Sequence, residues 1–295
     1  MIRSKTIGSR IFDVVNVIIL VTLVLLCLYP LWYTLCVSVS NKSAANAGLV
    51  TFYPIGFTTI SYQQIMGDKL FFNSFWISIQ RTVIGTAVSV LVSILMAYPL
   101  SKRPGEFAAR NVFMWILVFC MIFNGGMIPW YLTVQSYHMI NTMAALVFAG
   151  GLNVFNVILI MNFFRGIPKD LEEAAVVDGA GPWKILFRII IPVSVPVIAT
   201  ITLFIGVYYW NEFFNGLVLM NTSDKYPLQT YIQQMVVNIP AGTTLTPEQY
   251  KKLSQLSNVS LNGAKVFIAM VPMLVVYPFI QKYFVTGIMI GSVKG

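Results

Sequence analysis

Residues 14–39 read VVNVIILVTLVLLCLYPLWYTLCVSV and contain no charged side chain. A bilayer core is roughly 30 Å thick and needs about 20 apolar residues in a helix, because backbone groups in lipid must be hydrogen-bonded within the segment. This run is long enough, and it exceeds the roughly 7–15 apolar residues of a secretory signal peptide. We therefore interpret it as a retained membrane span, although the cations Arg3, Lys5 and Arg10 before it and the small residues at 45–47 are also typical of a signal sequence.

The composition of the whole chain extends this interpretation. Apolar residues make up 57% of the sequence and charged residues only 10%, against about 25% charged residues in an average soluble domain. So few charges could not cover the surface of a soluble protein of this length, so we expect lipid to face much of the chain. We predict an all-α integral membrane protein that forms one transmembrane domain over residues 1–295. Its six helical spans are expected at about 14–38, 74–100, 111–133, 142–164, 193–215 and 264–286.

The basic residues predict the orientation of these spans. If the N-terminus is cytoplasmic, six spans place the C-terminus in the cytoplasm too. The cytoplasmic side then holds 12 cations: Arg3, Lys5, Arg10, Lys102, Arg103, Arg110, Arg165, Lys169, Lys184, Arg188, Lys282 and Lys294. The outer side holds six: Lys42, Lys69, Lys225, Lys251, Lys252 and Lys265. This bias follows the positive-inside rule, so the net charge of +9 reflects topology, and we predict no binding to nucleic acid.

The residue types that carry metal or catalytic chemistry are sparse. Cys27, Cys36 and Cys120 fall in or beside predicted spans, and their spacing matches no zinc or redox motif. The single histidine, His138, lies in a short outer loop. We therefore expect no metal site and no catalytic residue.

The loop between the fourth and fifth spans, residues 167–192, is more structured than a simple connection requires. Asp170 is placed to cap a helix with Glu173 as its third residue, in a capping-box arrangement with acids at the positive end of the helix dipole. Alanines 174–175 favour helix and leave a low surface for close approach. Gly179 should end the helix, because glycine readily adopts the left-handed conformation found after helix ends.

A second helix should begin at Gly181-Pro182, and Pro192 should mark the point where the chain enters the fifth span. The result would be a short, rigid helix beneath the membrane, held between two bends. A groove on a partner could grip such a helix. A loop that only returns the chain to the bilayer remains an equal alternative from the residues alone.

The same loop resembles a known motif, the EAA loop of binding-protein-dependent ABC importers. That motif reads Glu-Ala-Ala, three residues, Gly, nine residues, Ile-x-Leu-Pro. This chain has Glu173-Ala174-Ala175, then Gly179, then Ile189-Ile190-Ile191-Pro192. The only departure is Ile191 in place of Leu, which is nearly isosteric.

Further blocks resemble the sugar-importer branch of this family. They are Tyr29–Trp32, Asn73-Ser74, Ala97–Lys102, Trp210–Phe214 and Gly287–Gly295. Phe123–Pro129 and Tyr226–Gln229 resemble permeases for complex oligosaccharides, some of which carry uronic acids. The resemblance implies the type I, maltose-permease-like fold and a place in the bacterial cytoplasmic membrane.

The resemblance also implies partners. In that family the EAA helix docks in a cleft of a separate ATPase, and closure of two ATPases switches a permease pair between inward-open and outward-open states. The residues carried over by position for this coupling are Glu172, Glu173, Ala174, Ala175, Asp178 and Gly179. The expected partners are a second, different permease, two ATPase subunits that hold ATP and Mg, and an extracytoplasmic solute-binding protein. The sequence has no Gly-x-x-x-x-Gly-Lys-Ser/Thr phosphate loop, so we expect no ATPase site and no cofactor on this chain.

Residues that could meet a sugar are aromatic side chains and amides in the spans, since sugars need hydrogen bonds and flat apolar faces. The candidates are Asn124, Asn153, Asn156, Tyr208, Tyr209, Trp210, Asn211 and Glu212. Each could instead be an interfacial aromatic, or an amide that joins helices. Asn124 beside two glycines also predicts a break in the third span. Arg81 lies within the second span, where it should face the bundle interior or reach outward to the interface.

One outer stretch and two alternative functions complete the predictions. We expect a short surface helix at 247–256, whose Lys251 and Lys252 form either a solvated basic face or a contact for an acidic ligand. A secondary transporter would need carboxylates at mid-membrane, and we expect none there, with Glu212 near the outer boundary. An intramembrane enzyme has no supporting cluster. A permease for a non-sugar solute is the nearest rival.

Overall fold

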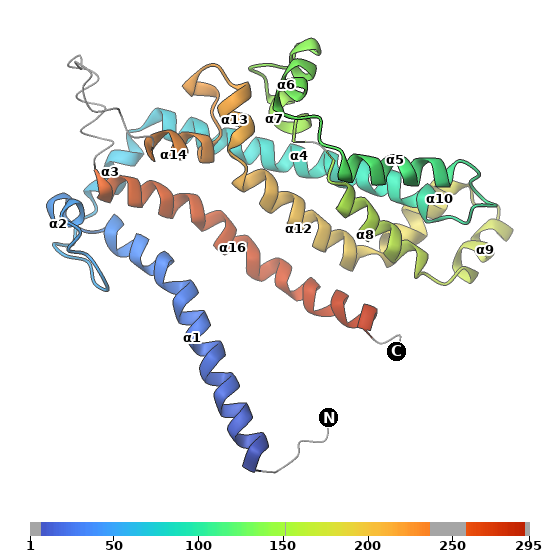
Figure 1. Ribbon diagram of the computed structural model, residues 1–295, viewed down its shortest axis with the longest axis horizontal. Helices are drawn as coiled ribbons and strands as arrows, with labels where there is room; N and C mark the ends of the chain where they lie inside the picture. The colour runs from blue at the N-terminus through green and yellow to red at the C-terminus, as the bar shows by residue number, and fades with distance from the viewer. Residues whose placement is uncertain (1–6, 151, 237–257, 293–295) are drawn as a thin grey trace. The chain divides into compact units, whose positions relative to one another are not determined.

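The computed structural model describes residues 7–150, 152–236 and 258–292, and every regular element in these ranges is helical (Figure 1). The predicted all-α class is thereby confirmed. The predicted surface helix at 247–256, with Lys251 and Lys252, lies outside the described residues.

Among the described residues, three helices are long and apolar enough to cross a bilayer unbroken. They are α1 (Ile7–Ser38), α4 (Lys69–Ser101) and the part of α16 (Val259–Ser292) up to Pro278, with mean hydropathies of 2.8, 2.1 and 1.8. Each reaches the roughly 20 residues that a spanning helix needs. They correspond to the first, second and sixth predicted spans.

The third predicted span is broken, as expected from its glycines. Helix α5 (Arg110–Ile122) and helix α6 (Met127–Ser136) meet at an angle of 119°. Gly126 adopts a left-handed backbone with φ of 85°, and its amide donates to Asn124 Oδ1 at 2.9 Å. Glycine takes this conformation without the penalty that a Cβ would bring. The predicted break at Asn124 is confirmed.

The fourth predicted span is not one helix, so the prediction of a continuous helix over 142–164 is wrong. Helix α7 (Met143–Phe148) ends before Ala149, and helix α8 (Val154–Arg165) begins after Asn153. The Asn153 side chain caps α8 by accepting a hydrogen bond from the Phe155 amide at 3.0 Å.

The chain turns into the fifth span two residues later than expected. Helix α10 (Pro182–Ile185), the π-helical segment η1 (Leu186–Ile190) and helix α11 (Ile191–Val193) precede Ser194, and α12 (Val195–Asn211) follows it at an angle of 83°. The bend thus lies between Pro192 and Pro196. If each bent pair forms one span, five spans are present among the described residues, with α8 as a shorter apolar helix. The count of six stays a prediction.

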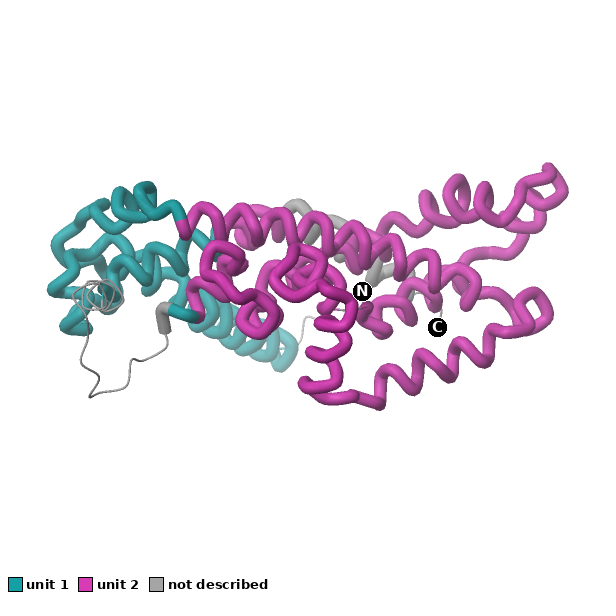
Figure 2. Tube along the Cα trace, turned by 90° about the horizontal axis from the view of Figure 1, so that it is seen from above, with its two compact units in different colours: residues 1–69, 234–271 teal, residues 70–233, 272–295 magenta. Residues whose placement is uncertain are grey.

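The described chain falls into two compact units (Figure 2). The first consists of residues 1–69 and 234–271 and includes α1, α2 (Lys42–Asn46), α3 (Ile60–Met66) and the start of α16. In it the Ser260 hydroxyl donates to the Val37 carbonyl at 3.0 Å, and the Lys265 ammonium pairs with Asp68 at 2.7 Å. These contacts hold the end of α1 and the end of α3 to α16.

The second unit, residues 70–233 and 272–295, contains the largest core. Ala97 of α4, Val157 and Ile160 of α8, Ile190 of η1 and Ile201 of α12 are fully buried in it. The unit also contains α13 (Phe214–Leu219), the 3-10 turn η2 (Ser223–Lys225) and most of α14 (Leu228–Val236).

Close packing between α4 and α12 depends on small residues. The buried face of α4 carries Ser74, Ser78, Gly85, Ser89 and Ser93. The Tyr209 ring of α12 lies directly over Gly85, and its hydroxyl forms a 3.0 Å hydrogen bond with Ser89. Small residues of this kind allow helices in a membrane to approach closely.

This packing predicts that Gly85→Ala destabilises the protein, because the new Cβ would lie 2.6 Å from Tyr209 Cζ. Overpacking of a filled core typically costs about 1–3 kcal/mol. Gly206→Ala on α12 is the matched control, since its Cβ would meet only Thr86 Oγ1 at an ordinary 3.6 Å. Thermal unfolding in detergent should show a lower midpoint for Gly85→Ala than for Gly206→Ala, and equal midpoints would contradict this packing.

Candidate functional site

The first helix of the loop 167–192 is α9 (Asp170–Val177). Lys169 is its N-cap and makes no side-chain cap bond, and Asp170 is the first helical residue. The predicted capping box is therefore wrong, because the helix begins one residue earlier than expected and Glu173 is its fourth residue. Asp170, Glu172 and Glu173 still lie in the first turn, where the positive end of the helix dipole favours acids.

The end of α9 is as predicted. Asp178 is the C-cap, and Gly179 adopts a left-handed conformation with φ of 74°. The Gly179 amide donates to the Val176 carbonyl and the Ala180 amide to the Ala175 carbonyl, both at 2.9 Å. These bonds satisfy the last carbonyls of the helix. Gly181 then caps α10, which begins at Pro182 as expected.

The two faces of α9 differ sharply. Ala175 is buried in the core of the second unit, at 8% exposure. Glu173, Ala174 and Val177 are exposed, and Val177 reaches 87%. At about 100° per residue these three side chains share the face opposite Ala175. Ala174 and Ala175 were expected to form a low surface together. Only Ala174 lies on the exposed face, because Ala175 points into the core.

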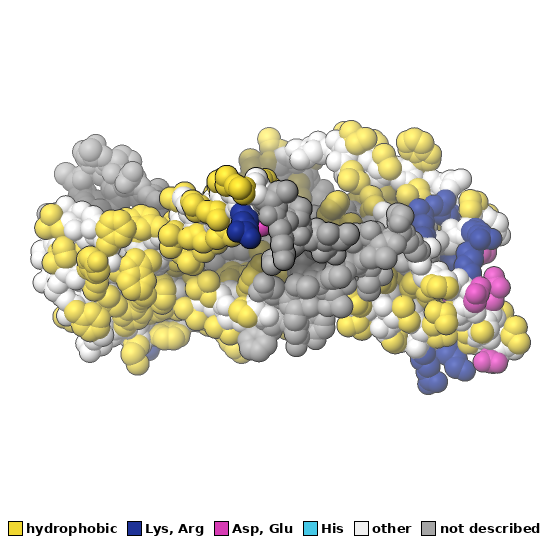
Figure 3. Space-filling view, turned by 90° about the horizontal axis from the view of Figure 1, so that it is seen from below, with side chains coloured by type: hydrophobic (Ala, Val, Ile, Leu, Met, Phe, Trp, Pro, Cys, Tyr) yellow, Lys and Arg dark blue, Asp and Glu magenta, His cyan; other side chains and the backbone are white. Residues whose placement is uncertain are grey.

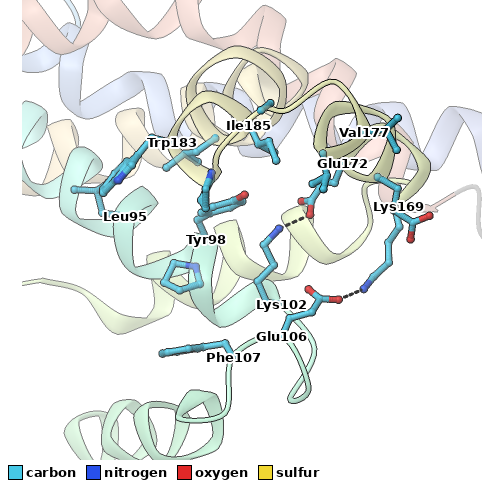
Figure 4. Close-up of a pocket in the computed structure, with 16 residues that line it drawn as sticks. Leu95, Tyr98, Lys102, Glu106, Phe107, Lys169, Glu172, Val177, Trp183 and Ile185 are labelled. Atoms are coloured by element: carbon cyan, nitrogen blue, oxygen red, sulfur yellow. Dashed lines mark hydrogen bonds and ion pairs between the residues drawn. The ribbon is translucent and has the colours of Figure 1, made fainter.

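Two ion pairs connect α9 and its N-cap to the loop after α4 (Figure 4). Lys102, which follows the last residue of α4, pairs with Glu172, and its ammonium lies 4.4 Å from the centre of the Tyr98 ring. Lys169 pairs with Glu106 at 2.8 Å. Neither pair could be predicted from the sequence, because the partners are 70 and 63 residues apart and no short-range spacing relates them.

The pKa values of these groups favour the charged pairs. Burial lowers the pKa of the Lys102 ammonium, but hydrogen bonds with Glu172 and Tyr98 outweigh burial, so its pKa is raised. The hydrogen bond from Lys169 holds the pKa of Glu106 below its ordinary value. Both shifts favour the charged forms of the Lys102 ammonium and the Glu106 carboxylate.

A groove of about 950 Å³ lies beside these pairs. The end of α4, the segment around Phe107, α9 and α10 form its walls, and most of the lining is apolar, including Leu95, Val176 and Trp183 (Figure 4). Figure 3 shows charged side chains gathered at the end of the second unit that carries α9 and α10. This end combines an apolar hollow with paired charges.

Several of the amides proposed to meet substrate form hydrogen bonds with the backbone. Asn124 and Asn153 accept hydrogen bonds from amides at the breaks described above. Asn211 Nδ2 donates to the Val207 carbonyl one helical turn earlier, at 3.0 Å. Asn156 is buried within α8.

Two of the three aromatic candidates lie next to the break between α7 and α8. The Tyr209 hydroxyl donates to the Val147 carbonyl at 2.7 Å, and the Tyr208 hydroxyl donates to the Gly150 carbonyl at 3.3 Å. Trp210 is buried, and its ring packs edge-on against Phe75 with centroids 5.9 Å apart. Tyr208 is the only one of these three that is substantially exposed, at 45%.

Arg81 and Glu212 form an ion pair that the sequence analysis did not anticipate. Arg81 is fully buried, so of the two expected arrangements it faces the interior. Its guanidinium pairs with the Glu212 carboxylate and also donates to the Glu212 carbonyl at 3.0 Å. Glu212 Oε1 accepts from the Asn215 amide at 2.7 Å, across the break between α12 and α13. Glu212 is thus partly buried against α4, and its expected place near the outer boundary stays a prediction.

We predict that Arg81→Met is strongly destabilising, because it leaves the Glu212 carboxylate buried without its cation. Removing one partner of a buried pair typically costs about 3–5 kcal/mol. Arg81→Met combined with Glu212→Gln should recover most of that loss, since the glutamine keeps an oxygen for the Asn215 amide. A double-mutant cycle on unfolding in detergent measures this, and equal losses in the single and double variants would contradict the pairing.

Comparison with known proteins shows the family to which this chain belongs. The family model described as "Binding-protein-dependent transport system inner membrane component" matches residues 82–290. In Bacillus subtilis (strain 168), the polygalacturonan/rhamnogalacturonan transport system permease protein YtcP is 36% identical over 287 residues, which cover 97% of this chain and 99% of that protein. Protein LplC of the same organism is 38% identical over 291 residues, 99% of this chain and 97% of that one.

A solved structure of a bacterial ABC transporter involved in the import of the acidic polysaccharide alginate contains a similar chain. It superposes with a TM-score of 0.85 at 33% identity and covers 95% of this chain and 99% of its own. The close fit over nearly the full length agrees with the type I permease fold. The chain therefore belongs to the family of binding-protein-dependent transport system inner membrane components, and it is a multi-pass membrane permease subunit of an ABC transporter.

Proposed function

We propose that this chain is the transmembrane subunit of an ATP-driven importer that carries oligosaccharides, including acidic ones, from an extracytoplasmic binding protein into the cytoplasm. Both termini would be cytoplasmic. A second, different permease would complete the path, and two partner ATPases would hold ATP and Mg.

The exposed face of α9 is the observation that carries this proposal. Glu173 makes no ion pair among the described residues, whereas Glu172 is occupied by Lys102. Glu173 is therefore available to a partner, with Ala174 and Val177 beside it as a small apolar surface. A cleft on an ATPase could hold this face in the way that grooves hold amphipathic helices.

The ion pairs supply a mechanical link for alternating access. If the loop made no contacts with the spans, a force on α9 would bend the loop and would not move the spans. The Lys102–Glu172 pair joins α9 to the end of α4, and Ala175 packs into the core that α4, α8 and α12 share. Movement of α9 would thus pass to the spans as a unit.

The substrate proposal depends on the relatives. One relative is named for the transport of polygalacturonan and rhamnogalacturonan, and the solved structure for the import of the acidic polysaccharide alginate. We therefore propose that the substrates of this chain are oligosaccharides that carry uronic acids. Tyr208, exposed beside the break between α7 and α8, is the aromatic candidate best placed for contact. A non-sugar solute remains the alternative within the same transport class.

Uptake in reconstituted vesicles tests this function. The chain, assembled with its partner permease, ATPase and binding protein, should accumulate labelled oligogalacturonate or oligoalginate only with ATP inside. Accumulation should persist when proton and sodium gradients are collapsed. Uptake driven by a gradient without ATP would instead indicate a secondary transporter, and uptake of only non-sugar solutes would overturn the saccharide assignment.

Glu173→Lys and Gly179→Asp should uncouple ATP hydrolysis from uptake while leaving membrane insertion intact. The first reverses a charge on the docking face, and the second places a side chain where a left-handed backbone is required. We expect uptake to fall about tenfold or more, the effect of losing roughly 1.4 kcal/mol or more at an interface.

Asp224→Lys is the control for charge reversal, because Asp224 is an exposed acid in η2, away from α9. It should transport like the unaltered protein. Normal uptake by Glu173→Lys would contradict the assigned role of α9.

A further inference from the structure

A second pocket, of about 360 Å³, lies on the other side of the two ion pairs from the apolar groove. It shares Lys102, Glu106, Lys169 and Glu172 with that groove, so these pairs separate the two hollows. The remaining wall comes from the loop after α4, the start of α5 and the end of α8. The function proposed above assigns no role to this pocket.

The pocket carries excess positive charge. Its lining holds five cations and two carboxylates, a formal balance of +3. The carboxylates are taken by Lys102 and Lys169. Arg103, Arg110 and Arg165 have no acidic partner among the described residues.

The backbone of α4 brings two of these arginines together. Arg110 Nε and Arg165 Nη2 both donate to the Leu100 carbonyl, each at 3.1 Å. That carbonyl lies in the last turn of α4, where the helix dipole favours cations. A guanidinium has five N–H donors, so both arginines keep donors for a further acceptor. Arg103 is exposed at the rim and makes no side-chain hydrogen bond among the described residues.

We propose that this pocket binds the phosphodiester headgroup of an anionic membrane lipid, with phosphatidylglycerol as the simplest example. Guanidinium groups bind phosphate oxygens through paired charge-assisted hydrogen bonds. Basic pockets between helices on the cytoplasmic side of a membrane are typical sites for anionic headgroups.

The neighbouring helix favours a lipid over a soluble anion. Exposed apolar side chains begin two residues after Arg110 on α5: Val112, Trp115 and Ile116 are 63%, 73% and 49% exposed. At about 100° per residue these side chains lie on the side of α5 away from Arg110, so they face the surroundings of the helix and not the pocket. A lipid whose headgroup occupied the pocket could pack its acyl chains against this apolar surface, whereas a free phosphate could not.

The site would connect lipid composition to α9. The Lys102–Glu172 pair is one wall of the pocket and also the link between α9 and α4. A bound phosphodiester would offset the mutual repulsion of the arginines beside this pair. Anionic lipid should therefore stabilise the arrangement that holds α9.

Thermal unfolding of the assembled importer in neutral detergent tests the proposal with three added probes: dioctanoyl phosphatidylglycerol, dioctanoyl phosphatidylcholine and inorganic phosphate. Only phosphatidylglycerol should raise the midpoint, in a saturable manner that yields its apparent affinity. Arg103→Gln should weaken that affinity about fivefold, the effect of one cation near an anionic headgroup. Arg110→Gln with Arg165→Gln should weaken it about 25-fold by the same rule.

Arg10→Gln is the matched control, since Arg10 is an exposed arginine on α1 and does not line the pocket. The double variant could unfold because it removes both donors to the Leu100 carbonyl. Arg103→Gln keeps those donors, so it decides the outcome in that case. Equal binding by Arg103→Gln and Arg10→Gln would overturn the site, and an equal effect of phosphatidylcholine or of inorganic phosphate would overturn its assignment to an anionic lipid.

Discussion

In a bilayer no water is available to backbone groups, so each interruption of a membrane helix needs an internal hydrogen-bond partner. At three such interruptions in the described part of the second unit, the partner is an amide or carboxylate side chain. Asn124 accepts from Gly126, Asn153 from Phe155, and Glu212 from Asn215. The helices can bend by large angles inside an apolar environment because these side chains replace the missing helical bonds.

The same constraint explains the buried arginine. A carboxylate at the break between α12 and α13 satisfies the Asn215 amide but brings an uncompensated charge. Arg81 of α4 supplies the opposite charge and also donates to the Glu212 carbonyl. The pair thus holds a polar break against α4, where Gly85 and Ser89 receive Tyr209. The small residues of α4, the Arg81–Glu212 ion pair and the break after α12 therefore depend on one another.

Local chemistry made part of this structure predictable. The apolar runs, the break at Asn124, the end of α9 at Gly179 and the start of α10 at Pro182 all follow from short-range signals. The break between α7 and α8 carried such a signal in Gly150, Gly151 and Asn153, which the apolar residues on either side obscured. Lys102–Glu172 and Arg81–Glu212 join residues far apart in the sequence, and no single-chain periodicity encodes such partners. The helix start at Asp170 was misplaced by one residue, an ordinary uncertainty for helix ends.

Glu172 and Glu173 of α9 make different contacts. The two acids are adjacent and chemically alike, yet they point about 100° apart around α9. Glu172 turns toward Lys102 and fastens the helix to α4, and Glu173 turns outward beside Val177. A helix that presented both acids outward would have no ionic link to the spans, and one that turned both inward would offer a partner no charge. Adjacent positions on a short helix allow one segment to be held from one side and contacted from the other, as the proposed coupling to a partner ATPase would require.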